Sequence, residues 1–165
     1  MLSPILYSLY TSDLPITDRC FPATYADDTA FFTASSQLRF CYRYMTAQIT
    51  AFHQWARRWR LKVNTAKSVA VIHTRRRQYT PQTLTYNNSD IPHKSEATYL
   101  GVRLDRGLTF FSHIRNIKCR ALRKINALFV ILRCAALSHA TRVYVLKMIV
   151  LSTLTYASPA WQHAA

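Results

Sequence analysis

Two patterns of apolar residues open the chain and predict a helix followed by a pair of strands. Residues 2–12 are expected to form a short helix that ends before Pro15. Aromatic, threonine and alanine residues then fill 21–33, a composition typical of strands, and Asp27 and Asp28 interrupt them. Because aspartate favours tight turns, we expect two short strands with both carboxylates at the connecting tip.

A long helix is predicted next, over residues 36–59, with Ser35 or Ser36 as its cap. Apolar side chains recur there at the three- and four-residue spacing of one helical face. We expect the middle of this face to pack across one side of the preceding strands. The face comprises Leu38, Cys41, Tyr42, Met45, Ile49, Phe52, Ala56 and Trp59.

Short apolar runs in the middle of the chain predict further strands. Val69–Ile72 and Tyr99–Leu104 each have the length and the β-branched or aromatic content of a strand. Between them, Asn87 and Asn88 are turn formers and predict a hairpin.

The last third of the chain changes to helical periodicity. One helix is predicted over 111–133, and a second from Ser138 to about Ala157, with Pro159 marking its end. We therefore expect an α+β fold in two parts, a small antiparallel sheet with helices over 1–108 and a helical part over 109–165. The apolar face of the first of these helices comprises Ile114, Ile117, Ala121, Ile125, Leu128 and Leu132.

Composition supports a folded core and excludes several classes of site. Half of the 165 residues are apolar and only two are glycine, so a Gly-rich phosphate loop is excluded. The four cysteines form no C-x-x-C pair, which argues against zinc and for reduced thiols inside the cell. No basic segment near Met1 suggests a signal peptide, and the apolar run Met148–Ala157 is too short to span a membrane, so no membrane partner is expected.

The net charge of +15 says more about the binding partner than the rest of the composition does. Ten Lys and Arg residues lie between Asp28 and Asp90 with no acid among them, and nine more follow Asp105. Such charge repels itself unless a polyanion neutralises it, and nucleic acid is the usual one. A solvated basic surface or a ribosomal-type protein is the alternative. The candidate contacts are Arg75, Arg76 and Arg77 in a basic loop, and Arg120, Arg123 and Lys124 largely opposite the apolar face of the 111–133 helix.

Asp27 and Asp28 are the candidate metal ligands. At a turn, adjacent carboxylates can approach one cation, and hard ions such as magnesium prefer carboxylate oxygens together with substrate phosphates. Most such pairs are ordinary solvated turn residues. This pair differs in its strand-like flanks and in the scarcity of acid elsewhere in the chain.

The chain contains, in order, the segments Leu2-Ser3-Pro4, Tyr25-Ala26-Asp27-Asp28, Asn64-Thr65-Ala66-Lys67-Ser68 and Tyr99-Leu100-Gly101. In this order they resemble the palm motifs of reverse transcriptases from non-LTR retrotransposons. The segment Tyr25-Ala26-Asp27-Asp28 is similar to their Y-A-D-D box, and Leu2-Ser3-Pro4 to the end of the box before it. Asn64-Thr65-Ala66-Lys67-Ser68 is similar to the later N-x-x-K-[ST] box, and Tyr99-Leu100-Gly101 to the primer-grip turn. The ending Tyr156–Trp161 resembles the thumb of jockey-type elements, so the resemblance covers essentially the whole chain.

The resemblance implies a role for each residue of these boxes. Asp27 would bind the catalytic metals, with Asp28 in a lesser ligating or structural role, and Lys67 would protonate the leaving pyrophosphate. Other residues would contact the substrates: Tyr25 and Ala26 under the primer end, Asn64 shaping the Lys67 loop, and Leu100 and Gly101 holding the primer strand. Without the resemblance, Lys67 would be read as a surface lysine, Gly101 as a strand bulge and the last helices as ordinary packing.

The chain also departs from the family pattern. A further aspartate upstream of Leu2-Ser3-Pro4, the fingers and an endonuclease domain are not among its residues. Asp13 and Asp18 follow the first helix and are not expected to replace that aspartate. We therefore expect the chain to be a C-terminal palm and thumb fragment that does not polymerise DNA in isolation.

The function implied for the full-length parent is RNA-directed DNA polymerisation by a two-metal mechanism. Its cofactor would be magnesium, or manganese in its place. Its partners would be an RNA template, a DNA primer or RNA–DNA duplex, and deoxynucleotide triphosphates, within a ribonucleoprotein of the nucleus and cytoplasm. Two alternatives remain: a non-catalytic, basic nucleic-acid-binding remnant or domesticated protein, and a decayed reading frame without function.

Overall fold

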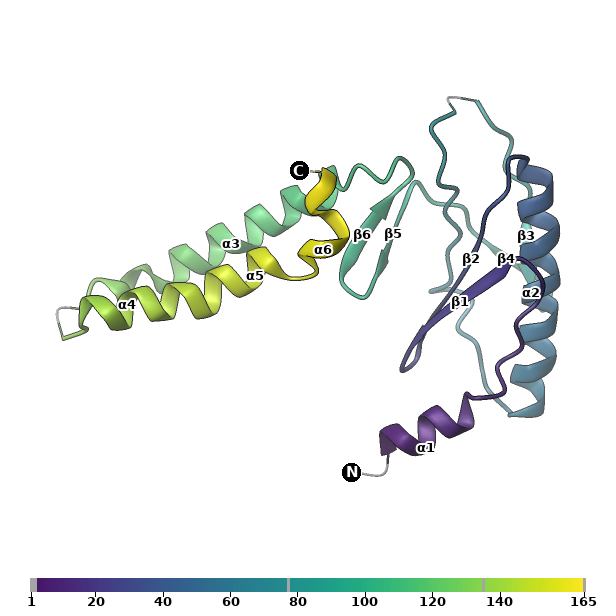
Figure 1. Cartoon of the computed structure of the whole chain (residues 1–165), viewed down its shortest axis with the longest axis horizontal. Coiled ribbons are helices and arrows are strands. Elements are labelled where there is room, and N and C mark those ends of the chain that lie inside the picture. The colour runs from purple at the N-terminus through teal and green to yellow at the C-terminus, as the bar shows by residue number, and fades with distance from the viewer. Residues whose placement is uncertain (1–2, 77, 135, 165) are drawn as a thin grey trace. The chain divides into compact units, whose positions relative to one another are not determined.

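The computed structural model describes residues 3–76, 78–134 and 136–164, which divide into two compact units. The first unit contains the chain up to Ile72 together with Arg76–Leu100, and the second contains His73–Arg75 and the chain from Gly101 onward. The first unit has helices α1 (Ser3–Tyr10) and α2 (Leu38–Arg58) and strands β1 (Cys20–Tyr25), β2 (Asp28–Thr33), β3 (Leu84–Tyr86), β4 (Ser89–Ile91) and β5 (Glu96–Tyr99) (Figure 1).

The second unit is mostly helical (Figure 1). It has strand β6 (Val102–Asp105), helix α3 (Phe111–Leu132), helix α4 (His139–Leu146), the π-helical segment η1 (Lys147–Leu151), helices α5 (Ser152–Thr155) and α6 (Ser158–Trp161), and the 3-10 turn η2 (Gln162–Ala164). Helices and small sheets together give the α+β class predicted for the chain.

Strands β1 and β2 form the predicted hairpin. They pair antiparallel from Cys20 opposite Thr33 to Tyr25 opposite Asp28, which leaves Ala26 and Asp27 as a two-residue turn. Ala26 takes a positive φ of 50°, a conformation that a tight hairpin turn requires and that glycine or asparagine usually supplies.

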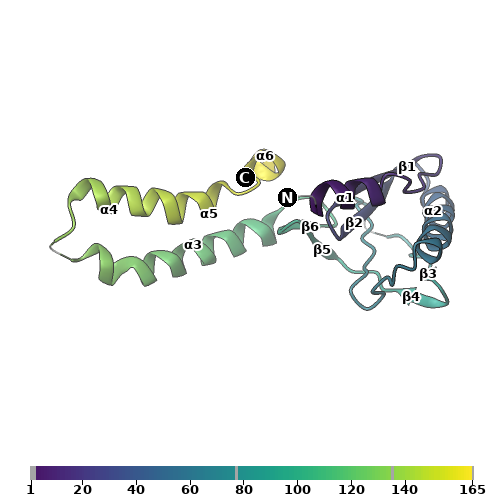
Figure 2. The same ribbon diagram turned by 90° about the horizontal axis from the view of Figure 1, so that it is seen from below.

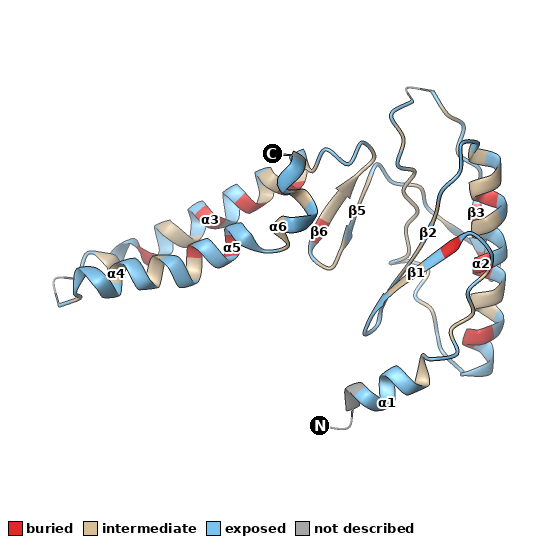
Figure 3. Cartoon of the chain, viewed as in Figure 1, coloured by how far each residue is buried: buried red, intermediate tan, exposed pale blue. Residues whose placement is uncertain are grey.

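Helix α2 covers this hairpin and carries most of the core of the first unit (Figure 3). The ring of Phe52 packs edge-on against Phe31 of β2 at 5.2 Å and reaches Tyr86 of β3 at 6.3 Å between centroids. Met45 and Ile49 join Tyr42 and Leu84 in the same cluster. The predicted helix and its apolar face are therefore confirmed, except at Trp59, which follows the last helical residue and is 38% exposed.

Two side chains of α2, Gln48 and Trp55, form hydrogen bonds to the segment that follows α1, and neither contact was predicted. Gln48 is fully buried, and its Oε1 accepts from the amide and the hydroxyl of Thr17 at 2.8 and 2.9 Å. Its Nε2 donates to the Pro15 carbonyl at 2.7 Å, so no polar atom of this side chain is left unpaired. The Trp55 indole donates to Asp13 at 2.7 Å, and together with Trp59 it holds the pKa of that carboxyl below its usual value.

The start of α2 corrects one prediction. Its N-cap is Gln37 rather than Ser35 or Ser36, and no side chain caps it. Ser35 Oγ instead accepts from the Gln37 amide at 3.4 Å, so the serine hydroxyl serves the turn before the helix.

The strand predicted over Val69–Ile72 is also wrong, because only Ala70 pairs there, in an isolated parallel bridge with His93. The Ala70 amide donates to the Pro92 carbonyl at 3.0 Å, and Lys94 donates back to the Ala70 carbonyl at 2.9 Å. The next bond of this ladder toward the N-terminus would need an amide hydrogen on Pro92, which proline lacks.

The Asn87-Asn88 hairpin is confirmed, since β3 and β4 flank these two residues and both take positive φ angles of 48° and 61°. Tyr99–Leu104 is not a single strand. Leu100 and Gly101 have φ angles of 46° and 76°, which end β5 before β6 begins.

In the second unit, α3 runs antiparallel to the continuous rod formed by α4, η1 and α5 (Figures 1 and 2). The buried residues Ala121, Leu128 and Val150 form the core between them, which confirms the predicted apolar face of α3. Ser138 caps α4 by accepting from the Thr141 amide at 3.1 Å. Two details differ from prediction: a π-helical turn interrupts the second helix, and Pro159 lies in the first turn of α6.

The Asp105 carboxylate organises the loop that leads into α3. It accepts from the amides of Gly107, Thr109 and Phe110 at 3.2, 3.1 and 2.7 Å, and from the Thr109 hydroxyl at 3.0 Å. Partial burial raises the pKa of Asp105, but these donors outweigh burial and leave the pKa below its ordinary value.

We predict that part of the acid sensitivity of the second unit comes from Asp105. A carboxyl with a lowered folded pKa stabilises above its unfolded pKa, about 3.9 for aspartate, and that stabilisation is lost as pH falls through the lower folded value. Urea denaturation followed by circular dichroism should therefore show a smaller loss of stability between pH 6 and pH 3 in Asp105→Asn than in the native chain. Asp90→Asn, which removes a carboxylate from β4, is the control, and an equal loss in both variants would contradict the prediction.

Candidate active site

The tip of the β1–β2 hairpin presents two adjacent carboxylates to solvent. Asp27 is the second turn residue and Asp28 is the first residue of β2, and both are exposed. Tyr25, the last residue of β1, is 67% exposed beside them. The hairpin therefore brings Tyr25, Ala26, Asp27 and Asp28 together at one edge of the first unit.

Two tyrosines that were not predicted to contact this hairpin donate hydrogen bonds to its backbone. Tyr7 of α1 donates its hydroxyl to the Ala26 carbonyl in the turn. Tyr99 of β5 donates to the Ala23 carbonyl of β1 at 3.0 Å. The partners are 19 and 76 residues apart in sequence, so no local pattern could have indicated these bonds.

The chemistry of the hairpin tip fits a hard divalent cation in part. Carboxylate oxygens are the donors that magnesium and manganese accept, and these two are open to a cation that also binds substrate phosphates. Among the described residues, however, no group of three or more His, Cys, Asp or Glu side chains is placed to hold a metal. Asp27 and Asp28 can supply one side of a carboxylate site and no more.

A second candidate loop is built around Asn64. The Lys67 amide donates to the Asn64 carbonyl at 3.2 Å and lies 3.3 Å from its Oδ1, while Ser68 Oγ donates to the same carbonyl at 3.1 Å. This closed turn leaves the Lys67 side chain exposed. No hydrogen bond among the described residues joins it to the hairpin tip.

The Leu100-Gly101 turn falls at the boundary of the two units, with Leu100 in the first and Gly101 in the second. Within the second unit, Gly101 lies against the side chain of Tyr156. A Cβ at this position would be 3.3 Å from Tyr156 Cε1, and the φ of 76° disfavours any side chain.

The candidate basic contacts differ in how far they are exposed. Arg75, Arg76, Arg120 and Arg123 are exposed, and Arg77 lies outside the described residues. Lys124 does not lie opposite the apolar face, because its Nζ donates to the buried Thr153 hydroxyl of α5 at 2.6 Å.

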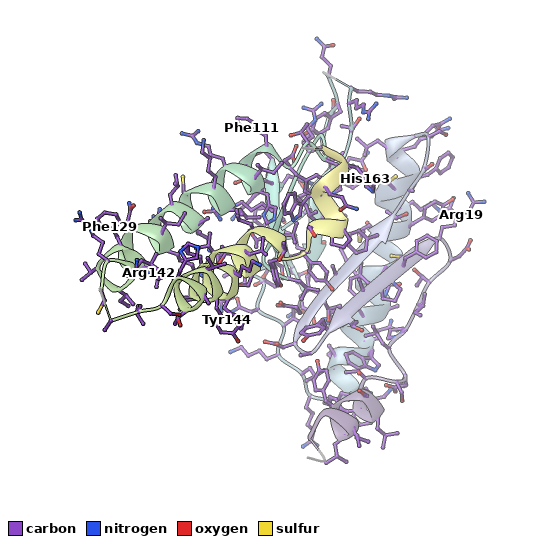
Figure 4. All side chains as sticks on the ribbon, turned by 60° about the vertical axis from the view of Figure 1, so that its left-hand side comes forward. Arg19, Phe111, Phe129, Arg142, Tyr144 and His163 are labelled. Carbon is purple, nitrogen blue, oxygen red and sulfur yellow. The ribbon has the colours of Figure 1, made fainter. Side chains whose placement is uncertain are left out.

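Several exposed residues of the second unit were not predicted as part of a site. Phe111 and Phe129, which are 72% and 54% exposed, lie on the outside of α3 (Figure 4). The Arg133 guanidinium lies 4.9 Å from the centre of the Phe129 ring, which groups an aromatic face with a cation. Exposed aromatic and basic side chains of this kind are typical of surfaces that contact nucleic acid.

His113 is buried in the second unit and has no assigned role. Its Nδ1 accepts from the Arg103 amide at 3.3 Å, and its ring packs edge-on against Trp161 at 5.9 Å between centroids. Burial, followed by nearby Arg103 and Arg120, lowers the pKa of this imidazole. The ring is therefore a neutral core group that joins α3 to α6.

Comparison with known proteins assigns the class. Residues 1–104, which include the hairpin and the Asn64–Lys67 turn, match the family model described as reverse transcriptase (RNA-dependent DNA polymerase). Because this match covers more than half of the chain, the chain belongs to the reverse transcriptase family. No solved structure matches it.

The curated relatives are polymerases of insect mobile elements. The chain is 31% identical, over 98% of its length, to the "Probable RNA-directed DNA polymerase from transposon X-element" of Drosophila melanogaster. It is 32% identical over 100% of its length to the "RNA-directed DNA polymerase from mobile element jockey" of Drosophila funebris, and 36% identical over 72% to the protein of that name from Drosophila melanogaster. The resemblance to jockey-type non-LTR retrotransposons is thereby confirmed. The chain spans between 14% and 19% of the length of these relatives.

None of the helices in the part of the chain that the structure describes combines the length and the apolar character needed to cross a membrane.

We predict that Gly101→Ala destabilises the second unit by roughly 1 kcal/mol, because an L-residue at positive φ costs 1–2 kcal/mol and the gain from a stiffer unfolded chain offsets only part of it. Urea denaturation measures the change. The matched variant is Gly107→Ala, at a glycine without a positive φ, where the added Cβ would lie 3.1 Å from Thr109 Cγ2, a tighter contact than the 3.3 Å at Gly101. A smaller loss there would assign the cost at Gly101 to its backbone conformation, and no measurable loss in Gly101→Ala would contradict the prediction.

Proposed function

We propose that this chain supplies the metal-binding hairpin, the nucleotide-side lysine loop and the duplex-binding helices of an RNA-directed DNA polymerase from a jockey-type non-LTR retrotransposon. The observation that carries the proposal is the position of Asp27 in the two-residue turn of an antiparallel hairpin packed on α2. Residues 1–108 would be part of the palm and 109–165 part of the thumb. The relatives named above are all polymerases, which gives no support to a domesticated binding protein.

Different residues of the first unit would bind the metal, contact the primer and donate a proton. Asp27, with Asp28 beside it, would bind magnesium, which when bound activates the primer hydroxyl and neutralises the triphosphate; manganese could replace it. Tyr25 and Ala26 would lie under the primer end. Lys67, held on the turn that Asn64 closes, would donate a proton to the departing pyrophosphate.

The remaining residues would hold the nucleic acid. Leu100 and Gly101 form a tight turn able to approach the primer backbone closely, since Gly101 has no side chain. The exposed arginines of α3 and of the 75–76 loop would bind the phosphates of the template–primer duplex. Within the element's ribonucleoprotein, the polymerase would act in the nucleus and cytoplasm.

The hairpin alone is not expected to polymerise DNA. Two metal ions roughly 3.5–4 Å apart need more anionic ligands than one adjacent pair of carboxylates provides. Each missing 1.36 kcal/mol of transition-state stabilisation costs a factor of ten in rate. Correct positioning of the nucleotide can lower the activation barrier by roughly 7–11 kcal/mol, and part of this is lost when the nucleotide is not held in place.

We predict that the purified 165-residue chain extends a primed RNA template no faster than its Asp27→Ala variant, with either magnesium or manganese present. Incorporation of radiolabelled nucleotide measures this. Extension by the native chain that disappears in the variant would show that these residues suffice for catalysis and that the argument from ligand number is wrong.

We predict salt-dependent duplex binding without sequence preference. If about five phosphates are contacted, the slope of log affinity against log salt should be near −4 to −5. The double variant Arg120→Gln/Arg123→Gln should reduce the magnitude of this slope by about 2. Arg39→Gln/Arg43→Gln on the exposed face of α2 removes equal charge and is the control. Fluorescence anisotropy with an RNA–DNA duplex measures both, and a salt-independent affinity would refute phosphate binding.

A further inference from the structure

The turn that carries Asp27 is conformationally strained and depends on an external contact. Ala26 takes a φ of 50°, in the left-handed region where the Cβ of an L-residue meets the neighbouring carbonyl. Glycine, asparagine or aspartate usually occupies such a position in a two-residue hairpin. Alanine provides no side-chain hydrogen bond that could compensate, so the turn needs support from elsewhere.

That support comes from α1. The Tyr7 hydroxyl donates to the Ala26 carbonyl, which belongs to the same planar peptide unit as the Asp27 amide. A hydrogen bond to this carbonyl therefore fixes the orientation of the peptide unit that joins Ala26 to Asp27. Tyr7 is 40% exposed, so this hydrogen bond lies at the surface of the first unit.

The neighbouring Tyr10 shows that this arrangement is specific to one residue of the helix. Tyr10 is also on α1 and also donates to a backbone carbonyl, but its acceptor is Trp59 beyond the end of α2, at 2.9 Å. Its ring packs edge-on against Trp59 at 4.6 Å between centroids. One tyrosine thus attaches α1 to α2, and the other attaches α1 to the hairpin turn.

We propose that Tyr7 is a positioning residue for the metal-binding carboxylates. It holds the Ala26–Asp27 peptide in its left-handed turn so that Asp27 and Asp28 face one cation. This inference rests on the proposed metal role of the hairpin. Tyr7 acts through the backbone and does not itself contact the metal.

The test compares Tyr7→Phe with Tyr10→Phe, because each removes one hydroxyl that donates to a carbonyl from the same helix. Manganese titration followed by electron paramagnetic resonance measures the affinity of the hairpin. The ¹H and ¹⁵N shifts of the Asp27 amide report the turn itself without metal. Removing a neutral hydrogen bond should weaken manganese binding by about 2- to 10-fold in Tyr7→Phe and should move the Asp27 amide shifts. Tyr10→Phe should leave both unchanged, with both variants folded by circular dichroism.

The outcomes separate this inference from the function on which it rests. If Asp27→Ala leaves manganese binding of the native chain unchanged, the metal role of the hairpin is wrong, and no Tyr7 variant is needed to show it. The positioning role is then decided by the metal-free readout alone. An unchanged Asp27 amide in Tyr7→Phe, or equal effects of Tyr7→Phe and Tyr10→Phe, overturns it.

Discussion

The first unit depends on the packing of helix α2 against the β1–β2 hairpin. A two-stranded hairpin is marginally stable in water unless its apolar face is covered. The Phe52 ring covers it by contacting Phe31 of β2 and Tyr86 of β3, which joins both small sheets to one helix. Packing on α2 anchors the strands behind the exposed turn that carries Asp27, and the Tyr7 hydrogen bond supports the turn itself.

The second unit must fold although nine Lys and Arg residues and no acidic residue follow Asp105. Its helices place small and branched residues such as Ala121 and Val150 at the contact and direct most charges outward. Lys124 and Arg142 are exceptions. The Lys124 ammonium donates to the Thr153 hydroxyl on the facing helix, and the Arg142 guanidinium donates to the Cys134 carbonyl. The remaining repulsion is a cost that a bound polyanion would relieve.

Local patterns predicted the elements whose signals are local, namely the long helices and the two hairpins. They failed where a distant partner decides the outcome. Val69–Ile72 has strand composition, but only Ala70 pairs, in a bridge with His93, and Pro92 has no amide hydrogen for the bond that would extend this bridge toward the N-terminus. Gln48 and Tyr7 gave no signal because their partners lie 31 and 19 residues away. The site itself was predicted from the order of family motifs, because two aspartates in a turn are common and carry little information alone.

The charge pattern gives a physical reason why the hairpin needs a cation if it works beside nucleic acid. Basic side chains elsewhere in the chain attract phosphates, whereas Asp27 and Asp28 would repel them at the point where they meet the hairpin. A divalent ion between carboxylate and phosphate reverses the sign of that interaction. Under the proposed function, a bridging metal would account for two carboxylates at an exposed tip of a chain whose net charge is +15.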